Sequence, residues 1–313
     1  MKITVLAPNT FGYIDTLVEK LEEYPNRSIT YINYDAVKFK YTSSLSRVYN
    51  FFLKIFLGKN LKKKFITEKM ILKFSEMERQ DFILVIRPDK LEKELLLFLK
   101  GKTQKLISYY FDSISTFPDK AKLISCFDIV YSFEKADVKN YNLKFITNFI
   151  PCDDKIEKCE GKGVFNISSK DSRLCVLQKI AEHLKTHNFP FKFIIRSEKL
   201  IPLDNIEVTQ HYMGLDKTKK YIQEASILLD IQKEEQEGLT FRVFEVLQFK
   251  KKMITTNSDI KNYDFYHPDN ILIIDKKNPV INEDFLQTPY KILPDSIIDK
   301  YRRKAWIELV FEV

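Results

Sequence analysis

Glycine is scarce in this chain, and the motifs that depend on it are missing. Only 7 of the 313 residues are glycine, and the sequence contains no G-x-G-x-x-G, no G-x-x-x-x-G-K-[ST] and no G-x-S-x-G. These patterns mark dinucleotide-binding folds, P-loop nucleotide hydrolases and the nucleophile turn of α/β-hydrolases. The sequence therefore weighs against a dehydrogenase, a P-loop enzyme and an α/β-hydrolase.

Long apolar runs and paired cysteines are also missing. No stretch approaches the roughly 20 apolar residues that cross a bilayer. The apolar run from Met1 to Pro8 is too short for a signal peptide and predicts a first strand instead. We expect a cytoplasmic protein with reduced thiols, since no C-x-x-C pair occurs among its four cysteines, Cys126, Cys152, Cys159 and Cys175.

Basic residues outnumber acidic ones by 51 to 43, which gives a net charge of +8. This balance fits a polyanionic partner or an anionic membrane face, and it equally fits a solvated, lysine-rich surface. One metal pattern stands out, because His183 and His187 lie four residues apart on a predicted helix. We predict no metal there, because zinc sites need further ligands.

Residues 45–64 combine an apolar stripe with a lysine cluster. The apolar residues recur at helical spacing, and Lys59 and Lys62 to Lys64 follow them; the stripe comprises Leu45, Val48, Tyr49, Phe52, Ile55 and Phe56. A helix lying in a membrane interface has this composition, so we expect the region to dock on anionic lipid. The alternative is a helix that packs on its own domain and leaves its lysines in solvent.

Strand and helix patterns alternate along the first half, as in a parallel sheet covered on both faces. Helices are predicted between the strands, for example at Asp15–Glu23 and Leu91–Lys100. Strands are predicted at Lys2–Ala7, Ser28–Asn33, Phe82–Arg87, Lys105–Phe111, Ile129–Phe133 and Lys144–Ile150.

A polar stretch at 151–163 without periodicity predicts a linker, and a second alternation follows it. A long helix is predicted from Asp171 to about His187, and a last helix at Asp295–Phe311. The predicted strands are Val164–Ser168, Phe191–Arg196, Asn205–Val208, Ile227–Ile231, Lys252–Thr256 and Ile271–Ile274. The pattern therefore predicts an α/β chain of two Rossmann-like halves, residues 1–152 and 153–294, followed by the helix at 295–313.

The segment after the Ile227–Ile231 strand has the chemistry of a nucleotide site. A helix is predicted from Phe241 to Phe249, with Thr240 as its N-cap. Arg242 offers a cation for phosphate near the positive end of the helix dipole, and Glu245 offers a carboxylate that accepts hydrogen bonds from a ribose diol. The alternative is a surface salt bridge between the two side chains, worth about 0.3–0.5 kcal/mol.

This segment resembles the donor-nucleotide motif of glycosyltransferases with the two-domain GT-B architecture. Glu237 and Glu245 keep the spacing of two glutamates with seven residues between them, and the stretch is similar to a Gly-Leu-x-x-Arg-x-x-Glu-x-Leu signature of bacterial surface-polysaccharide transferases. The resemblance implies that the second glutamate holds the ribose and the first lies near the transferred sugar. One departure is that Lys250, Lys251 and Lys252 follow this helix, where the family often has a glycine.

The resemblance also implies a division of labour between two domains that face each other across a cleft. The C-terminal domain would bind the donor, with Arg196 reaching its diphosphate, and the last helix would pack back on the N-terminal domain. The acceptor would meet a loop of Phe11, Gly12 and Tyr13. Among the acids of the cleft, the candidates for the general base are Asp15, Asp112 and Glu134.

We therefore expect a glycosyltransferase that moves a sugar from a nucleotide-sugar donor to a hydroxyl of a surface glycan, as in capsule or lipopolysaccharide synthesis, or of a lipid-linked acceptor. No cofactor or metal is expected, because no Asp-x-Asp occurs in the sequence. Two alternatives stay open. One is a nucleotide-sugar epimerase of the same architecture, in which the stripe would pack internally. The other is a non-catalytic, basic nucleic-acid-binding module.

Overall fold

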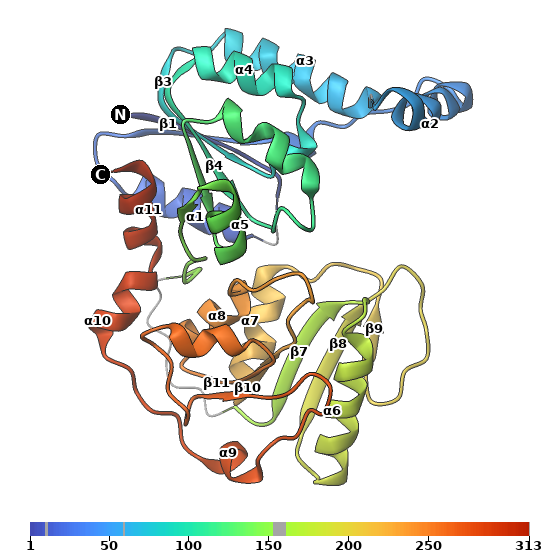
Figure 1. The fold of residues 1–313 in the computed structure, drawn as a ribbon, viewed down its shortest axis with the longest axis vertical. Helices are drawn as coiled ribbons and strands as arrows, with labels where there is room; N and C mark the ends of the chain where they lie inside the picture. The colour runs from blue at the N-terminus through green and yellow to red at the C-terminus, as the bar shows by residue number, and fades with distance from the viewer. Residues whose placement is uncertain (10–11, 59, 153–160, 313) are drawn as a thin grey trace. The chain divides into compact units, whose positions relative to one another are not determined.

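The computed structural model of the chain describes residues 1–9, 12–58, 60–152 and 161–312. The chain divides into two compact units, each built on one parallel sheet of six strands (Figure 1). The first unit comprises Met1–Thr10 and Leu17–Ile146, and the second comprises Phe11–Thr16 and Thr147–Val313. The predicted boundary at residue 152 and the predicted return of the last helix to the first domain stay predictions.

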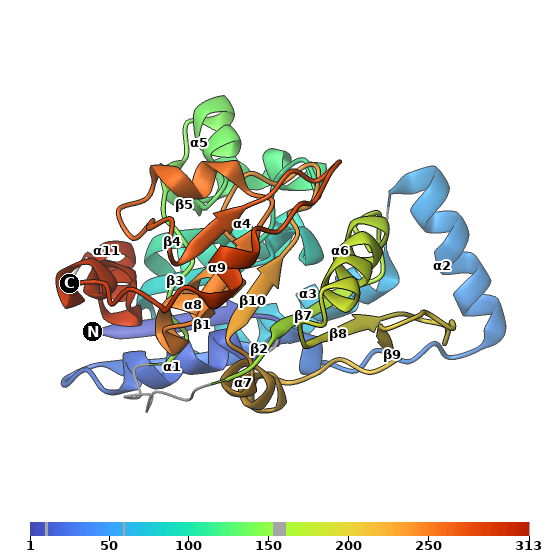
Figure 2. The ribbon, with the colours of Figure 1, turned by 90° about the horizontal axis from the view of Figure 1, so that it is seen from below.

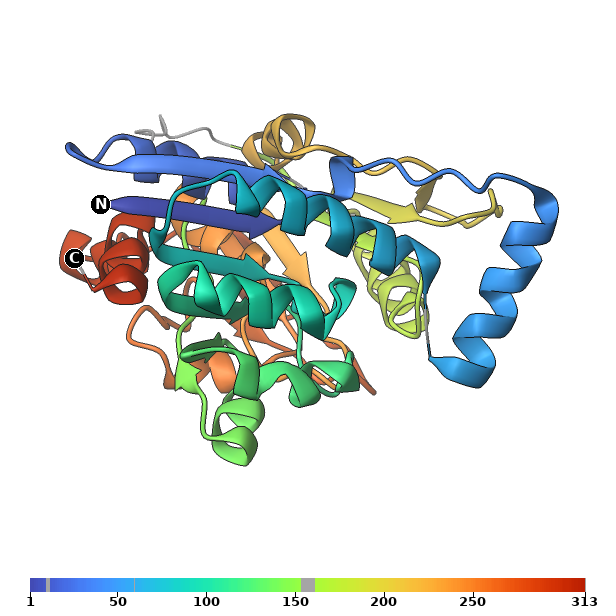
Figure 3. The ribbon, with the colours of Figure 1, turned by 90° about the horizontal axis from the view of Figure 1, so that it is seen from above.

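The sheet of the first unit has the strand order β2-β1-β3-β4-β5-β6, and all its neighbours pair in parallel. Helices α3 and α4 lie side by side along this sheet (Figure 3). The strands are β1 (Lys2–Ala7), β2 (Ser28–Asn33), β3 (Gln80–Ile86), β4 (Thr103–Tyr110), β5 (Ile129–Ser132) and β6 (Lys144–Phe145). The helices are α1 (Tyr13–Glu22), whose residues 13–16 belong to the second unit, α2 (Ser44–Leu57), α3 (Leu61–Ser75), α4 (Lys93–Gly101) and α5 (Lys135–Tyr141).

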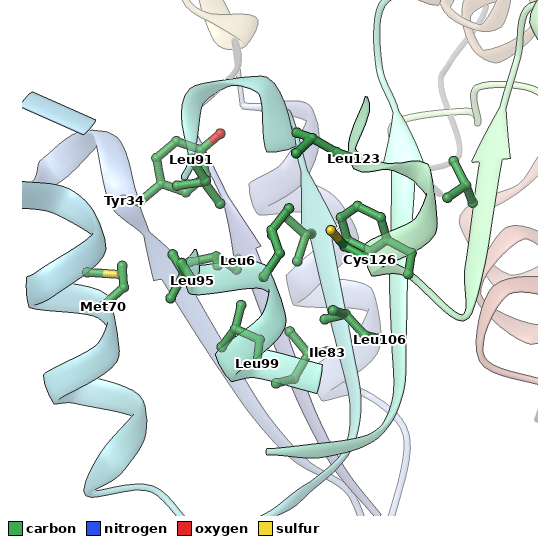
Figure 4. Packing of buried hydrophobic residues seen from close by; sticks show 14 of the residues in the cluster. Leu6, Tyr34, Met70, Ile83, Leu91, Leu95, Leu99, Leu106, Leu123 and Cys126 are labelled. Carbon is green, nitrogen blue, oxygen red and sulfur yellow. The ribbon is translucent and has the colours of Figure 1, made fainter. Parts of the chain in front are cut away.

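The core of the first unit explains why its strands read as continuous apolar runs. Leu6 and Ile83 of the sheet pack against Met70 of α3 and Leu95 of α4, and all four are buried (Figure 4). Five of the six residues of β1 are buried, so the strand is buried on both faces. Parallel strands buried on both faces lack the polar alternation of half-exposed strands.

The sheet of the second unit has the order β12-β11-β10-β7-β8-β9, again with parallel neighbours, and α6 lies along β7 and β8 (Figure 2). The strands are β7 (Val164–Ser169), β8 (Phe191–Arg196), β9 (Glu207–Thr209), β10 (Ile227–Asp230), β11 (Lys252–Thr255) and β12 (Ile271–Ile273). The helices are α6 (Leu174–Thr186), α7 (Leu215–Glu224), α8 (Phe241–Phe249), α9 (Glu283–Gln287), α10 (Asp295–Ile298) and α11 (Arg303–Phe311).

Two apolar clusters cover the two faces of the second sheet. Leu228 packs with residues of α7 and α8, whereas Ile227 and Leu229 pack with residues of α6. Successive side chains of a strand point to opposite faces. The predicted α/β class with two Rossmann-like halves is therefore confirmed. Apart from β6, the predicted strands agree with the observed ones to within two residues at each end.

Two predicted elements are wrong in extent, and one contact explains both. The strand predicted at Lys144–Ile150 keeps only Lys144–Phe145, and the helix predicted at Asp295–Phe311 is interrupted between α10 and α11. The Ile150 N–H donates to the Tyr301 carbonyl at 2.8 Å, and Ile150 forms an isolated parallel bridge with Arg302. Because Arg302 is extended there, the terminal helix starts again only at Arg303.

Among the described residues, no helix is both long enough and apolar enough to cross a membrane.

Candidate functional site

A cluster of charged residues lies at the carboxyl edge of the second sheet. Asp230 is the last residue of β10, and the chain passes from there through a turn into α8 at Phe241. Glu245 lies one turn into α8, and its side chain is 1% exposed. In open α/β sheets ligands bind at this edge, where strands end and helices begin.

Both carboxylate oxygens of Glu245 accept hydrogen bonds. Oε2 lies 2.5 Å from Nη1 of Arg242, and Oε1 accepts a bond of 2.8 Å from the Tyr13 hydroxyl. The Arg242 side chain is 12% exposed. The pair is therefore buried, and the surface salt bridge weighed as an alternative does not describe it. A buried pair of this kind holds its two side chains in fixed positions, because separating them leaves a charge without compensation.

Tyr13 is tied to α8 by its ring as well as by its hydroxyl. The ring stacks on Phe241 with centroids 4.0 Å apart and an interplanar angle of 10°. Burial and the neighbouring Glu245 charge raise the pKa of Tyr13 well above its ordinary value, so the hydroxyl stays protonated and donates. Gly12 precedes it with φ of +89°, a conformation that favours glycine. Phe11, the third residue of the predicted acceptor loop, lies outside the described residues.

Thr240 occupies the predicted N-cap position, but its hydroxyl has a different partner. It donates to Oδ1 of Asp230 at 3.1 Å and makes no side-chain cap bond to α8. The prediction of a hydroxyl that accepts from the helix backbone is therefore wrong. The buried Asp230 carboxylate thus orients the Thr240 hydroxyl, which donates to it.

Asp230 and Arg173 were not predicted for this site. Burial raises the pKa of Asp230, while the charges of Arg242 and Arg173 and the Thr240 bond act in the opposite direction. Arg173 follows β7, where two of its nitrogens bind the Asp171 carboxylate at 2.7 and 2.9 Å. Its Nη1 donates to the Ile231 carbonyl at 3.1 Å. Asp230 was detectable in the sequence as a charge that ends an apolar run.

Arg196 and Glu237 both belong to the second unit. Arg196 ends β8, and its guanidinium stacks over the Tyr212 ring at 3.8 Å. Its Nε is buried and has no hydrogen-bond partner among the described residues. The Glu237 side chain is exposed, and the Glu237 carbonyl accepts a bond of 2.9 Å from Asn257. The two glutamates of the motif therefore have opposite environments.

The predicted general bases occupy different surroundings. Asp15 is partly exposed in the first turn of α1. In the first unit, Asp112 follows β4 and Glu134 follows β5, and the negative charges of both raise the pKa of buried Tyr109, after the larger effect of burial itself. Asp112 and Glu134 therefore lie near one another at the carboxyl edge of that sheet, as their parallel strands require.

Asp112 belongs to a further polar cluster that sequence reasoning missed. Arg87 binds Asp89 and Asp112, each with a shortest N–O distance of 2.8 Å, and it has a left-handed backbone with φ of +59°. Lys120 is 0% exposed, and its amine donates to the Asp112 carbonyl at 2.6 Å. Burial lowers the pKa of Lys120 to about 8. The signal for this cluster was weak, since single charges after strands usually face solvent.

The predicted pair of histidines is a local structural feature. The rings of His183 and His187 are tilted by 34° with centroids 4.3 Å apart, and Nε2 of His187 lies 3.3 Å from a Glu283 oxygen. Within the part of the chain that the structure describes, no group of three or more His, Cys, Asp or Glu side chains is placed to hold a metal ion.

Comparison with known proteins identifies the fold. No family model matches the sequence, and no curated protein matches it. A UDP-GlcNAc 2-epimerase from Neisseria meningitidis bound to UDP-GlcNAc matches with a TM-score of 0.56 and 10% identity over 100% of both chains. HepE from Anabaena, in complex with UDP and glucose, matches with 0.52 and 10% over 99% of this chain and 95% of that one. The glycotransferase of kitacinnamycin matches with 0.50 and 10% over 99% and 98%.

The chain has a GT-B fold. The resemblance drawn from the α8 motif is thereby confirmed at the level of fold, since an identity of 10% carries no information about the reaction. Transferases and epimerases share this architecture, so the GT-B fold leaves the choice between them open.

Proposed function

We propose that this chain is a glycosyltransferase that moves a sugar from a nucleotide-sugar donor to a hydroxyl of a surface glycan or a lipid-linked acceptor. The observation that carries the proposal is the buried pair of Glu245 and Arg242 at the start of α8. A carboxylate that accepts from a diol beside a cation that binds phosphate matches the two polar parts of a nucleoside diphosphate. The GT-B fold supports the binding of a nucleotide sugar, because its solved examples include proteins bound to UDP or UDP-GlcNAc.

In this proposal the ribose of the donor takes the place of the Tyr13 hydroxyl on Glu245. The carboxylate is 1% exposed, and Arg242 and Tyr13 already bind its two oxygens. A ribose hydroxyl is the same kind of donor as the phenol, so the exchange keeps Oε1 bonded. Arg242 remains on Oε2 and directs its other nitrogens to the phosphates.

The leaving diphosphate is neutralised by side chains in this proposal. Arg242 and Arg196 supply fixed positive charge, and the N-terminus of α8 adds its dipole. Among the described residues no partner accepts from Nε of Arg196, so this side chain has one donor left over. No metal is included, because the sequence holds no Asp-x-Asp. The acceptor hydroxyl loses its proton to a carboxylate, for which Asp15, Asp112 and Glu134 remain the candidates.

Nucleotide binding tests the proposal directly. We expect one of UDP, GDP, CMP and dTDP to raise the melting temperature of the wild-type protein. Glu245→Gln should weaken that nucleotide about 10- to 100-fold, because a charged hydrogen-bond acceptor is lost. The matched control is Glu182→Gln, an exposed glutamate of α6 in the same unit, which should keep wild-type affinity. A protein that responds to none of the four nucleotides would contradict the proposal.

The exchange at Tyr13 predicts an unusual gain. Tyr13→Phe removes the hydroxyl that competes for Oε1 of Glu245, so nucleotide binding should tighten about 5- to 10-fold, which corresponds to about one net hydrogen bond. Tyr141→Phe, at an exposed tyrosine of α5, is the control. Isothermal titration measures both, and weaker binding by Tyr13→Phe would show that the hydroxyl assists the donor instead of competing with it.

The epimerase alternative makes a different prediction about products and about α2. Incubation with the donor alone should give an epimerised nucleotide sugar if the alternative is right, whereas a transferase leaves the sugar configuration unchanged until an acceptor is added. An epimerase has no need of acceptor docking and favours an apolar stripe that packs internally. The stripe of α2 is exposed, which supports the transferase.

A further inference from the structure

Helix α2 exposes an apolar stripe along one face. The exposed fractions of its side chains run from 50% at Phe52 to 80% at Leu45; the stripe comprises Leu45, Val48, Tyr49, Phe52, Ile55 and Phe56. Their spacing of three and four residues places them on one side of the helix. Contiguous apolar surface of this kind on a folded protein marks a place where a partner binds.

The helix that carries the stripe is well formed and anchored from its other side. Ser43 and Ser46 form a reciprocal capping box at its start, and Gly58 ends it in the left-handed conformation. Asn50 is buried, accepts a bond of 2.8 Å from the Leu61 backbone and donates one of 2.8 Å to the Tyr41 hydroxyl. These bonds fix α2 beside the start of α3 (Figures 1 and 3), while the side chains of the stripe stay exposed. The exposure is therefore a property of the folded unit.

The stretch of residues 36–67, which includes α2 and the start of α3, accounts for the whole net charge of the chain. Residues 36–67 hold eight basic residues and no acidic one; the basic residues are Lys38, Lys40, Arg47, Lys54, Lys59, Lys62, Lys63 and Lys64. Taking these eight from the 51 basic residues leaves 43, which the 43 acidic residues balance. The chain is thus electrically neutral except for one stretch of 32 residues that also exposes apolar side chains.

We propose that α2 and the first turn of α3 bind the surface of an anionic phospholipid bilayer. The stripe enters the boundary between headgroups and acyl chains, and Lys62 to Lys64 meet the lipid phosphates, each with an expected contribution of about fivefold in affinity. A second copy of the chain would bring eight further positive charges against these eight. A nucleic acid satisfies the charge but offers no apolar phase to six aliphatic and aromatic side chains.

Vesicle flotation tests the proposal on the full chain. Wild-type protein should float with vesicles of phosphatidylcholine and phosphatidylglycerol, and far less with phosphatidylcholine alone. The triple change Lys62→Glu, Lys63→Glu and Lys64→Glu should reduce binding at least about 100-fold. Its control is an equal charge reversal at three lysines of α7, made by Lys217→Glu, Lys219→Glu and Lys220→Glu, which should still bind.

A second variant and control test the contribution of the apolar stripe of α2 to vesicle binding. Phe52→Ser with Phe56→Ser should reduce vesicle binding at least about tenfold, whereas Leu200→Ser with Ile292→Ser, at two exposed apolar residues outside the segment, should not. The exposed positions leave folding intact, which circular dichroism checks.

Four results would overturn the proposal. They are equal binding to neutral vesicles, retained binding in either test variant, a dimer in light scattering that the serine variant abolishes, and oligonucleotide binding that depends on the lysines but not on the phenylalanines. Nucleotide response is measured separately, so that membrane binding and sugar transfer succeed or fail independently.

Discussion

Helices α2 and α8 are both rich in phenylalanine, yet α8 is mostly buried and α2 is mostly exposed. In α8 seven of nine residues are buried, including Glu245, whereas in α2 only Asn50 and Leu53 are buried among fourteen. Each helix is followed within six residues by a cluster of lysines. Apolar content therefore does not determine which helix enters a core.

This difference in burial follows from the connection between parallel strands to which each helix belongs. α8 is the sole helix between β10 and β11, so it must cover the sheet that these strands form. The chain between β2 and β3 holds both α2 and α3, and α3 supplies the buried side chains Ile66, Met70 and Phe74. One helix suffices to join two parallel strands. α2 is the surplus helix, and its apolar face is left for another use.

The sharpest test of this comparison is the same change made in both helices. Phe244→Ala in α8 removes a side chain with 0% exposure and should cost about 4 kcal/mol in the free energy of unfolding. Phe56→Ala in α2, at a side chain 73% exposed, should change it by no more than about 0.5 kcal/mol. Urea unfolding measures both. A cost above about 1 kcal/mol for Phe56→Ala would mean that the α2 stripe is covered in solution.

The polar residues of α8 should resemble its core in their effect on stability. Glu245→Ala leaves buried Arg242 without its carboxylate and the Tyr13 hydroxyl without its acceptor, so it should cost about 3 kcal/mol. The exposed pair of Lys64 and Glu68 in α3 is the control, and Glu68→Ala should cost at most about 0.5 kcal/mol. Equal costs in denaturant titrations would show that the α8 pair is not buried in solution.

The comparison extends to lysines, because Lys120 is buried whereas Lys62 is exposed. Burial lowers the pKa of Lys120 to about 8, whereas the pKa of a lysine in the unfolded chain is about 10.4. The folded state therefore disfavours the charged amine, and stability should rise by up to about 3 kcal/mol as the pH goes from 8 to 10.4. Lys120→Met should abolish that part of the rise between urea titrations at pH 7 and pH 10, while Lys62→Met should retain it.

The sequence predicted the strands well because burial on both faces leaves uninterrupted apolar runs such as Lys2–Ala7. It also predicted that Arg242, Glu245 and Thr240 share one helix start. It did not reveal that Tyr13 binds Glu245, since the two residues lie 232 positions apart and no local pattern links them. Asp230 stood out in the sequence as a charge at the end of an apolar run, but its burial could not be predicted from that pattern.

Contacts between residues far apart in the sequence also explain the strand and the helix whose extents were predicted wrongly. The apolar run to Ile150 predicted a strand, but its last residues meet Tyr301 and Arg302 from the far end of the chain. Exposure of the α2 stripe was one of two alternatives that the sequence left open, since an amphipathic pattern shows that a helix has an apolar face and not what covers that face. Whether a stripe is covered depends on which helix of the connection packs on the sheet.

The ends of the two helices offer the smallest and cleanest comparison. Both end on a left-handed residue, which is Gly58 with φ of +62° in α2 and Lys250 with φ of +50° in α8. Lys250 thus ends α8 in a conformation that favours glycine, at a cost in backbone strain. Lys250→Gly should stabilise the protein by about 1 kcal/mol, because its side chain is exposed and only the strain is lost. Gly58→Ala should destabilise α2 by a similar amount, and no shift in thermal unfolding for either variant would mean that the two ends fray in solution.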